Sequence, residues 1–371
     1  LAYRAFDAVS SDETTIVVNC AGRTRGIIGA QSLINAGIRN PVVTLMNGTQ
    51  GWVLSGRQMA RGNMRVAAPP TAAGLQRATE AAARIARRFG VTEIDAAQLE
   101  EFRADAERTL FLFDVRTPEE YAAGHLPGSR SAPGGQLIQS TDYYVGTRHP
   151  RLVLCDDTGV RARMTASWLL QLGLRDVYVL KGGLAQPGSA LAYGAEPAEV
   201  LPPADGGETE VVTVAQLDQA LAGGGVEVLD LTSSLDYRRA HIPGAWFAVR
   251  SRIVDALQKL EASKQIVLTS SDGAFARLAS GDVARMAGRA VRCLQGGTAA
   301  WKAAGMRLAD GEERMASPAD DVWHSPYDAK DQRAAMLAYL KWEVELMHQL
   351  EREGGTPFKS FAAEAGDGNP R

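Results

Sequence analysis

The chain has 371 residues, of which 45% are hydrophobic and 22% are charged, and its formal net charge is -3. This composition is typical of a globular protein, and the length exceeds one ordinary core, so we expect roughly two to four domains. The weak net charge argues against nucleic acid or an anionic membrane surface as a partner, and no run of about 18 apolar residues predicts a membrane-spanning helix.

Three cysteines, Cys20, Cys155 and Cys293, lie far apart in the sequence. Their odd number and wide spacing do not predict a disulfide framework. We therefore expect a reducing cytoplasm, in which the thiols stay free. The sequence has no cluster of metal-ligating residues, no phosphate-binding loop and no dinucleotide fingerprint, so we expect neither a metal nor a cofactor.

The first segment that indicates chemistry is Thr15–Ala30, in which an apolar run leads through a short polar loop into a helix. Cys20 lies in this loop, followed by Arg23 and Arg25. Backbone N–H groups and the positive end of a helix dipole converge at such a turn, where they stabilise a thiolate and bind anions. The alternative is that Cys20 is a small buried hydrophobic residue, as most free cysteines are. That alternative leaves the two arginines unexplained.

The strand before Cys20 begins within about fifteen residues of Leu1, which is too early for a complete α/β domain. We therefore expect further sequence upstream of Leu1. Residues 1–65 are then the C-terminal half of a domain.

The pattern of strand, loop and helix recurs in the middle of the chain. There, an apolar strand ends at Cys155, and Arg161 opens a helix that stops at Gly173. Cys20 lies 17 positions before the glycine that ends its own helix, Gly37, whereas Cys155 lies 18 positions before Gly173. This count pairs Cys155 with Cys20 and predicts a second loop that is one residue longer.

A third copy of the pattern lies at Gln265–Gly288. Counting 18 positions back from Gly288 places Ser270 at the cysteine position, and the arginine position then falls on Ala276. The third loop is therefore expected to have lost both groups and to be a structural or docking copy.

Each copy continues with an apolar strand and a glycine turn, at 42–52, 177–184 and 291–301. Strands that alternate with helices predict parallel βα units. Cys293 lies inside the last of these strands and is expected to belong to the core.

A second repeated pattern precedes the second and third loops. Asp114–Ser129 reads DVRTPEEYAAGHLPGS and Asp230–Ala245 reads DLTSSLDYRRAHIPGA, with the aspartate, tyrosine, histidine and proline positions all offset by 116. His125 and His241 each precede a Pro-Gly turn, so we expect them to hold the turn through backbone hydrogen bonds rather than to act as general bases. The aspartates are expected to cap the turns that follow them.

The spacing C-x4-R from Cys20 to Arg25 resembles the active-site loop of the rhodanese sulfurtransferases. The two G-H-[LI]-P-G-type segments, AGHLPGS and RAHIPGA, resemble the signature before the catalytic half of rhodanese domains, and the resemblance extends to about residue 310. It implies an α/β fold of tandem rhodanese-like domains, each a mostly parallel five-stranded sheet flanked by helices, with a C-terminal helical extension.

The resemblance and the composition divide the chain into five parts. A linker and an alanine-rich helix separate the first two copies, and a proline-containing stretch at 196–208 separates the second from the third. The expected parts are the half-domain with Cys20 at 1–65, the linker and helix at 66–90, the domain with Cys155 at 91–200, the domain without a catalytic cysteine at 209–312, and the helical tail at 313–371.

The resemblance also implies the chemistry of a thiosulfate sulfurtransferase. A cysteine thiolate attacks the outer sulfur of thiosulfate or a similar small sulfur anion, sulfite leaves, and cyanide or another thiol removes the sulfur from the persulfide. Cys20 is the expected persulfide carrier. The groups expected to bind the anion are the loop residues Ala21, Gly22, Arg23, Thr24 and Arg25, together with Arg161 of the second loop.

Cys155 is expected to be a weaker second catalytic cysteine. Asp156 and Asp157 follow it directly, and their negative charges should raise the pKa of its thiol and repel an anion. Its C-x5-R spacing to Arg161 also resembles the longer loop of the dual-specificity cell-cycle phosphatases. Two alternatives to sulfur transfer therefore stay open: phosphatase or arsenate chemistry at Cys155, and a non-catalytic scaffold or sulfur-relay binding protein.

The C-terminal segment Asp328–Glu353 has the periodicity of a long helix with a broad apolar face. We expect it to pack onto a domain of the same chain, and a homodimer contact is the alternative. Trp323, His324 and Tyr327 are expected to form a docking segment rather than a site.

Overall fold

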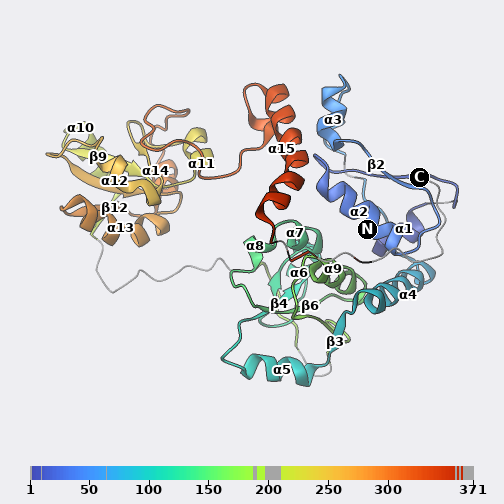
Figure 1. Cartoon of the computed structure of the whole chain (residues 1–371). Helices are drawn as coiled ribbons and strands as arrows, with labels where there is room; N and C mark the ends of the chain where they lie inside the picture. The colour runs from blue at the N-terminus through green and yellow to red at the C-terminus, as the bar shows by residue number, and fades with distance from the viewer. Residues whose placement is uncertain are drawn as a thin grey trace. The chain divides into compact units, whose positions relative to one another are not determined.

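The computed structural model describes residues 2–9, 11–63, 65–186, 190–196, 210–355, 357–358 and 361. The chain forms two compact units (Figure 1): unit 1 comprises Leu1–Pro197 with Asp331–Arg371, and unit 2 comprises Ala198–Lys330. The predicted linker at 196–208 lies, from residue 197 on, outside the described residues. Within the described ranges, no helix is both long enough and apolar enough to cross a membrane.

Unit 1 begins with a small βα layer that carries Cys20. Two parallel strands pair with Ile16 opposite Val42, and their outer faces are open, since Val17 is 56% exposed. The buried side of this layer packs Val18 and Leu33 against an alanine-rich helix. Its elements are α1 (Ala2–Ala8), β1 (Ile16–Val18), α2 (Thr24–Asn35), β2 (Val42–Thr44), α3 (Gly48–Leu54) and the packing helix α4 (Ala72–Phe89).

Helix α4 joins this layer to the next domain. Thr71 caps its N-terminus by accepting a hydrogen bond from the Gly74 N–H at 3.0 Å, and Gly90 ends it in the left-handed conformation with φ +69°. Ala78 and Ala82 are fully buried, and such small side chains let neighbouring helices approach closely. Arg87 and Arg88 in the last turn lie favourably at the negative end of the helix dipole.

The second domain of unit 1 is built on a five-stranded parallel sheet in the order β3-β7-β6-β4-β5. Its central strands are almost entirely buried, as expected for a parallel sheet that is covered on both faces. Its strands are β3 (Thr92–Ile94), β4 (Leu110–Asp114), β5 (Arg130–Ser131), β6 (Arg151–Cys155) and β7 (Val177–Leu180). Its helices are α5 (Ala96–Ala104), α6 (Pro118–Ala122), α7 (Gly134–Gln139), α8 (Thr141–Tyr144) and α9 (Val160–Gln171).

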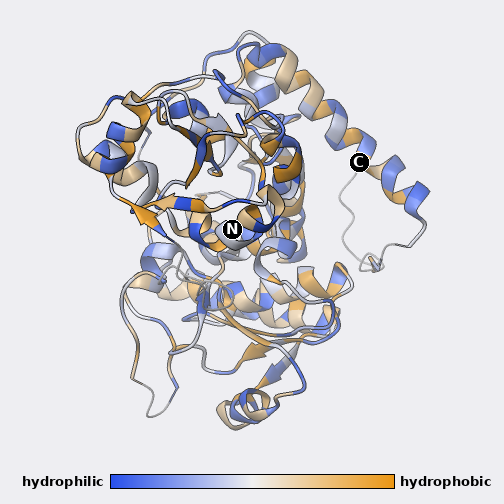
Figure 2. Cartoon of the chain, turned by 90° about the vertical axis from the view of Figure 1, so that its left-hand side faces the viewer, coloured by the Kyte–Doolittle hydropathy of each residue, from blue (hydrophilic) through white to orange (hydrophobic). Residues whose placement is uncertain are grey.

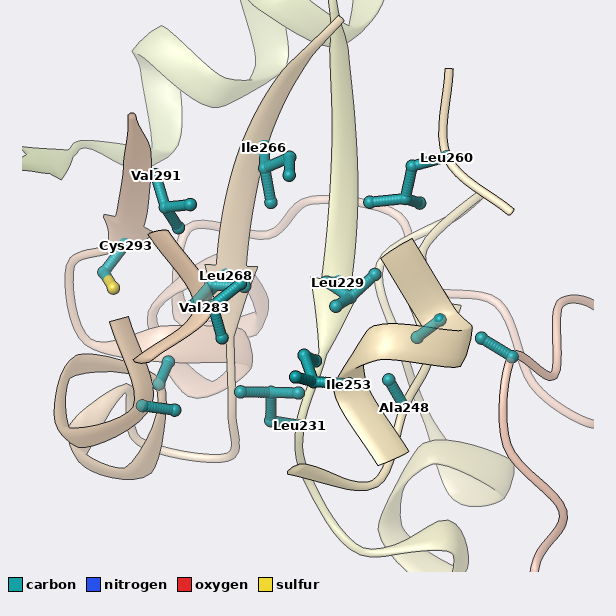
Figure 3. Close-up of a cluster of buried hydrophobic side chains, with 14 residues drawn as sticks. Leu229, Leu231, Ala248, Ile253, Leu260, Ile266, Leu268, Val283, Val291 and Cys293 are labelled. Carbon is teal, nitrogen blue, oxygen red and sulfur yellow. The ribbon is translucent and has the colours of Figure 1, made fainter. Parts of the chain in front are cut away.

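Unit 2 repeats this topology, with its parallel strands in the order β8-β12-β11-β9-β10. Figure 3 shows the core on one side of this sheet, where Leu229, Ile266 and Leu268 of the strands meet Ile253 and Val283 of the covering helices. The strands are β8 (Val211–Val212), β9 (Val226–Asp230), β10 (Trp246–Phe247), β11 (Gln265–Thr269) and β12 (Val291–Leu294). The α-helices are α10 (Val214–Ala222), α11 (Ser234–Arg239), α12 (Ile253–Leu257), α13 (Ala274–Ala287) and α14 (Gly297–Ala303).

The structure confirms the predicted α/β fold with two parallel five-stranded sheets. The strands are mostly coloured as hydrophobic in Figure 2, whereas the surrounding helices carry both colours, as expected when one helix face packs on a sheet. Cys293, predicted to be core, lies in β12 and is fully buried.

The C-terminal helix α15 (Gln332–Glu353) belongs to unit 1, in agreement with the expectation that it packs onto a domain of its own chain. It lies beside α3, and Arg333 Nη1 donates to the carbonyl oxygen of Leu54 at 3.3 Å. Met336 and Leu340 are buried, whereas Leu337 is 51% exposed. The covered face of the helix therefore rests on the layer that carries Cys20.

Candidate active site

Cys20 follows strand β1 at the carboxyl edge of the small sheet, four residues before helix α2 begins at Thr24. Its side chain is partly buried, and its Sγ accepts a hydrogen bond from the Gly26 N–H at 3.3 Å. This is a loop that leads into the positive end of a helix, with at least one N–H group directed at the sulfur. Such groups stabilise negative charge, and the catalytic role of Cys20 stays a prediction.

The first turn of α3 forms backbone hydrogen bonds with this loop. The carbonyl oxygen of Cys20 accepts from the Thr49 N–H at 2.9 Å, and that of Ala21 accepts from the Gln50 N–H at 3.0 Å. Gly48 has φ +58°, and a Cβ at this position would overlap the carbonyl oxygen of Cys20. The turn therefore requires glycine, and its backbone fixes the direction in which the loop faces.

The carboxylate of Glu343, on the C-terminal helix α15, contacts this loop. Glu343 of α15 accepts a hydrogen bond from the Arg23 N–H at 3.1 Å and from the Thr24 hydroxyl at 3.0 Å, with the Thr24 N–H at the longer distance of 3.5 Å. The approach is close: a Cβ on Gly22 would lie 2.6 Å from a carboxylate oxygen of Glu343 and 2.8 Å from the Tyr339 ring. This contact spans about 320 residues, and no sequence pattern indicated it.

Three further side chains, those of Tyr339, Arg23 and Arg25, define the charge around the loop. Tyr339 donates its hydroxyl to Glu343 at 3.3 Å, and burial followed by the negative charge of Glu343 raises the pKa of Tyr339 to about 12. The guanidinium groups of Arg23 and Arg25 make no hydrogen bond or ion pair with any residue the structure describes, and Arg25 is exposed. Both stay available to an anion.

Sheet register aligns the loop after Cys155 with the third loop, in which Ser270 was predicted to match Cys20. Asp114 at the end of β4 lies opposite Cys155, and Asp230 at the end of β9 lies opposite Thr269. Cys155 therefore corresponds to Thr269, the residue before Ser270. The sequence count that paired Cys155 with Cys20 is wrong by one residue.

The backbone hydrogen bonds of the three loops give the same result. In each, a carbonyl oxygen accepts an N–H from the segment after the next strand, and the three acceptors are Cys20, Asp156 and Ser270. The donors are the N–H groups of Thr49 at 2.9 Å, Leu184 at 3.2 Å and Thr298 at 3.0 Å. Asp156, and not Cys155, therefore stands at the position of Cys20.

This correspondence also corrects the arginine positions. Arg161 follows Asp156 by the same five residues that separate Arg25 from Cys20, so the second loop is not longer than the first. In the third loop the position of Arg25 is held by Phe275, not by Ala276. The count failed because it paired cysteine with cysteine: Asp156 lies 17 positions before Gly173, as Cys20 lies 17 before Gly37, and α9 and α2 both have 12 residues. The extra position in the third copy lies in α13, which has 14 residues.

Cys155 is an interior residue of strand β6. Its side chain is 0% exposed and packs in a cluster with Leu112, Leu126 and Leu180. Burial, followed by the charges of Asp114 and Asp156, raises its pKa well above the usual range of a thiol. These surroundings are those of an inert core cysteine.

In the second loop, the backbone N–H groups are bound by a side chain of the loop itself, that of Asp156. The buried carboxylate of Asp156 accepts from the N–H groups of Gly159 at 2.6 Å and Arg161 at 2.9 Å, and from the Thr158 hydroxyl at 3.2 Å. The Arg161 guanidinium donates to Glu120 at 2.7 Å and to Asp157 at 2.8 Å. Arg161, predicted to bind substrate, is thus committed to neighbouring carboxylates.

The third loop keeps the geometry of the first without its chemistry. Ser270 Oγ accepts from the Ala276 N–H at 3.2 Å, as Cys20 Sγ does from Gly26. A hydroxyl cannot carry a persulfide, and Phe275 offers no charge to an anion. A cavity of about 580 Å³ lies beside this loop, with Phe275 and Met286 among its lining residues.

The repeated upstream segments serve the turns, as expected. His125 Nδ1 lies 2.9 Å from the carbonyl oxygen of Tyr121, and the two rings stack at 3.8 Å; His241 has the same bond to Tyr237 at 2.7 Å. Asp114 accepts from the Arg116 N–H two residues on, at 3.0 Å. Among the described residues, no group of three or more His, Cys, Asp or Glu side chains could hold a metal ion.

His324, expected in a docking segment, binds within unit 2. Its Nε2 lies 3.2 Å from Ser234 Oγ, and its Nδ1 lies 3.0 Å from Arg238 Nη1. The segment that follows the third domain is thereby fastened to α11.

Comparison with known proteins relates both five-stranded domains to one family. The family model described as "Rhodanese-like domain" matches residues 95–186 and 213–304. The chain is 37% identical over 92 residues to the uncharacterized protein YqhL of Bacillus subtilis, covering 25% of this chain and 71% of that protein. It is 31% identical over 86 residues to the thiosulfate sulfurtransferase GlpE of Pseudomonas paraeruginosa, covering 23% of this chain and 74% of that protein.

One solved structure matches almost the whole chain. The crystal structure titled as thiosulfate sulfurtransferase from Pseudomonas aeruginosa is 44% identical and superposes with a TM-score of 0.87. The match covers 97% of this chain and 68% of that one. The likeness therefore includes the layer with Cys20, which lies outside the two segments that the family model matches.

Proposed function

The chain belongs to the rhodanese family as a tandem-domain member, and we propose from this that it is a sulfurtransferase that carries sulfur on Cys20. The donor class is thiosulfate or a similar small sulfur anion, and the acceptor is cyanide or another thiol. The observation that carries the proposal is the Cys20 loop, in which the sulfur of the half-buried Cys20 accepts the Gly26 N–H at 3.3 Å and two arginines lie within five residues.

The reaction divides into two displacements at sulfur. The Cys20 thiolate attacks the outer sulfur of thiosulfate, so that a new S–S bond forms while the old one breaks and its electron pair leaves with sulfite. The acceptor, as cyanide or a thiolate, then attacks the outer sulfur of the persulfide, and the pair of that S–S bond returns to Cys20 as the thiolate. No external oxidant or reductant is needed, and the cysteine is regenerated.

The loop supplies the electrostatics of both steps. Backbone N–H groups of Arg23 and Thr24 face the position where an anion would bind, and the Arg23 and Arg25 guanidinium groups add positive charge. Preorganised N–H groups stabilise negative charge without having to reorganise during the reaction. Ala21 and Gly22 contribute backbone and little bulk.

The other two domains have structural roles in this proposal. The burial of Cys155 argues against sulfur transfer at that residue and equally against phosphatase or arsenate chemistry there. The three cysteines are free, and a reducing compartment such as the cytoplasm would keep Cys20 in its thiol form.

The proposal is tested by steady-state thiosulfate:cyanide sulfur transfer with the whole chain. We expect wild type and Cys155→Ser to form thiocyanate at similar rates, provided that Cys155→Ser folds with the wild-type circular dichroism spectrum, and Cys20→Ser to form none above background. Equal activity of Cys20→Ser and wild type would refute the role of Cys20. The absence of turnover in all three proteins would favour a scaffold or sulfur-relay role.

A further inference from the structure

The Cys20 loop already holds an anionic group, the Glu343 carboxylate. It accepts the Arg23 N–H at 3.1 Å and the Thr24 hydroxyl at 3.0 Å, and it lies against Gly22. The positive end of α2, a helix of 12 residues, faces the same place. A sulfur donor with two or three anionic oxygens would need the same N–H groups.

The position of Glu343 is fixed by a hydrogen bond to its own side chain and by the packing of helix α15. Tyr339 donates to its carboxylate at 3.3 Å from one turn earlier in α15. Met336 and Leu340 anchor the helix through buried side chains, and Arg333 bonds to the carbonyl oxygen of Leu54. The carboxylate is therefore placed by a packed helix rather than by a lone surface side chain.

The second loop provides an internal parallel. There the Asp156 carboxylate accepts the N–H groups of Gly159 and Arg161 at 2.6 and 2.9 Å. Two loops of the same design in one chain thus each bind a carboxylate through backbone N–H groups. The difference is that the carboxylate in the first loop comes from a separate helix, so that displacing this one side chain leaves the hydrogen bonds within the loop in place.

We propose that Glu343 is a specificity-determining residue of the Cys20 site: its carboxylate occupies the anion-binding part of the loop, and a small anionic reagent reaches Cys20 only by displacing it. This inference rests on the proposed function for its biological meaning, but it makes a claim about access to the thiol that holds without turnover. Neutral reagents of the same shape accept these N–H groups more weakly than an anion does, so the Glu343 carboxylate affects them less.

Two alkylating reagents of the same shape and different charge test the claim. Iodoacetate is an anion and iodoacetamide is neutral. Each reagent is allowed to react with the intact, folded chain, and the rate at which it modifies Cys20 is then measured by peptide mass mapping. The variants are Glu343→Gln, which removes the charge, Glu343→Asp, which keeps the charge but withdraws it by one methylene, and Glu345→Gln as the matched control. Glu345 lies two residues along the same helix, 51% exposed, and pairs only weakly with Lys341 at 3.7 Å.

In Glu343→Gln we expect the ratio of the iodoacetate rate to the iodoacetamide rate to be about tenfold higher than in wild type. This is the factor expected if the Glu343 carboxylate occupies the site about nine-tenths of the time. Glu343→Asp should show a smaller gain in the same direction, and Glu345→Gln should match wild type. Equal rate ratios in Glu343→Gln and wild type would overturn the proposal. So would a gain in Glu345→Gln as large as in Glu343→Gln, or no gain in Glu343→Asp, because either result would mean a long-range charge effect.

Sulfur transfer gives a second readout with a distinct failure. If wild type turns over thiosulfate, Glu343→Gln should lower its KM for thiosulfate by a similar factor with little change in kcat. If KM and the alkylation ratio are both unchanged in Glu343→Gln, the role of Glu343 is refuted and the proposed function is unaffected. A changed alkylation ratio in a chain that never turns over would support Glu343 and contradict the proposed function.

Discussion

Asp156 occupies, in the loop after β6, the position that Cys20 occupies in the loop after β1. The two residues share the backbone hydrogen bond that their carbonyl oxygens accept, from Thr49 in one case and Leu184 in the other. Where the first loop has the sulfur of Cys20, the second loop has a carboxylate that accepts the N–H groups of its own loop. The first loop therefore presents a thiol, whereas the N–H groups of the second are bound by its own side chain.

The first prediction concerns the reactivity of the three thiols. In the native chain we expect a neutral thiol reagent to modify Cys20 alone, because Cys155 and Cys293 are 0% exposed. Burial raises the pKa of Cys155 well above the usual range and that of Cys293 to about 11, so neither forms thiolate at neutral pH. Titration with iodoacetamide should give one modified cysteine per native chain and three in denaturant. Modification of Cys155 in native protein at the rate of Cys20 would contradict the assignment.

The second prediction concerns the glycine behind the Cys20 loop. Gly48→Ala should disturb the loop and abolish most sulfur transfer, because its Cβ would overlap the carbonyl oxygens of Cys20 and Gly22 and its φ is +58°. Gly56→Ala is the matched control, since Gly56 has φ +82° with open space around it and should cost only the backbone strain of about 1 kcal/mol. Turnover rates and thermal unfolding of both variants provide the check. Equal losses of activity would mean that strain alone, and not the contact with the loop, decides the outcome.

The third prediction concerns the buried pair Asp114 and Arg116. The Arg116 guanidinium donates to Asp114 at 2.7 and 3.0 Å and to the carbonyl oxygen of Gly124, and both side chains are buried. Arg116→Leu would leave a buried carboxylate without a counter-charge, so we expect a loss of about 3–5 kcal/mol in the free energy of unfolding. Arg39→Leu, which breaks the exposed pair with Asp12 at 3.7 Å, should cost less than about 1 kcal/mol. Urea denaturation of both variants distinguishes the two cases, and similar losses would refute the importance of burial.

The fourth prediction concerns pH and unit 2, where Asp230 forms no ion pair with any arginine in the part of the chain that the structure describes. Burial raises the pKa of Asp230 from 3.8 to about 6, and among the described residues its Oδ2 has no hydrogen-bond partner. Between these two values the folded state binds more protons than the unfolded state, so this group's stabilising contribution is complete below about pH 4 and is lost as the pH rises through 6. The whole effect is about 3 kcal/mol.

Asp230→Asn removes this titration and keeps an oxygen that can accept the Thr232 N–H. Relative to wild type, the variant's unfolding temperature should therefore rise progressively as the pH is raised from 4 to 7. Calorimetry of both proteins across this range measures the difference. A difference that is constant with pH would show that the pKa of Asp230 is the same in the folded and the unfolded state.

Much of the fold follows from local patterns. The repeated Asp114–Ser129 and Asp230–Ala245 segments and the alternation of apolar strands with helices predicted two parallel domains, because parallel strands are buried along their whole length. The anion-binding character of the Cys20 loop also follows from local sequence. The correspondence of Asp156, rather than Cys155, with Cys20 did not follow from local sequence. A cysteine at the end of the second strand was the natural match for Cys20, and only sheet register and the backbone hydrogen bonds of the loops show that it lies one residue too early.

The contact of Glu343 with the Cys20 loop could not be predicted from the sequence. An amphipathic helix indicates that one face is covered but not what covers it, and nothing in Gln332–Glu353 distinguishes Glu343 from the other acidic residues of the helix. The partner lies about 320 residues away. Only tertiary packing brings the carboxylate to the N–H groups of Arg23 and Thr24.

The most direct test of the account is the intact mass of the chain after incubation with thiosulfate and removal of small molecules. The account predicts an added mass of one sulfur atom on wild type and on Cys155→Ser, located to the Cys20 peptide and removed by cyanide, and no added mass on Cys20→Ser. Sulfur that remains bound to Cys20→Ser, or a wild-type chain that never acquires it, would contradict the assignment of Cys20 as the carrier.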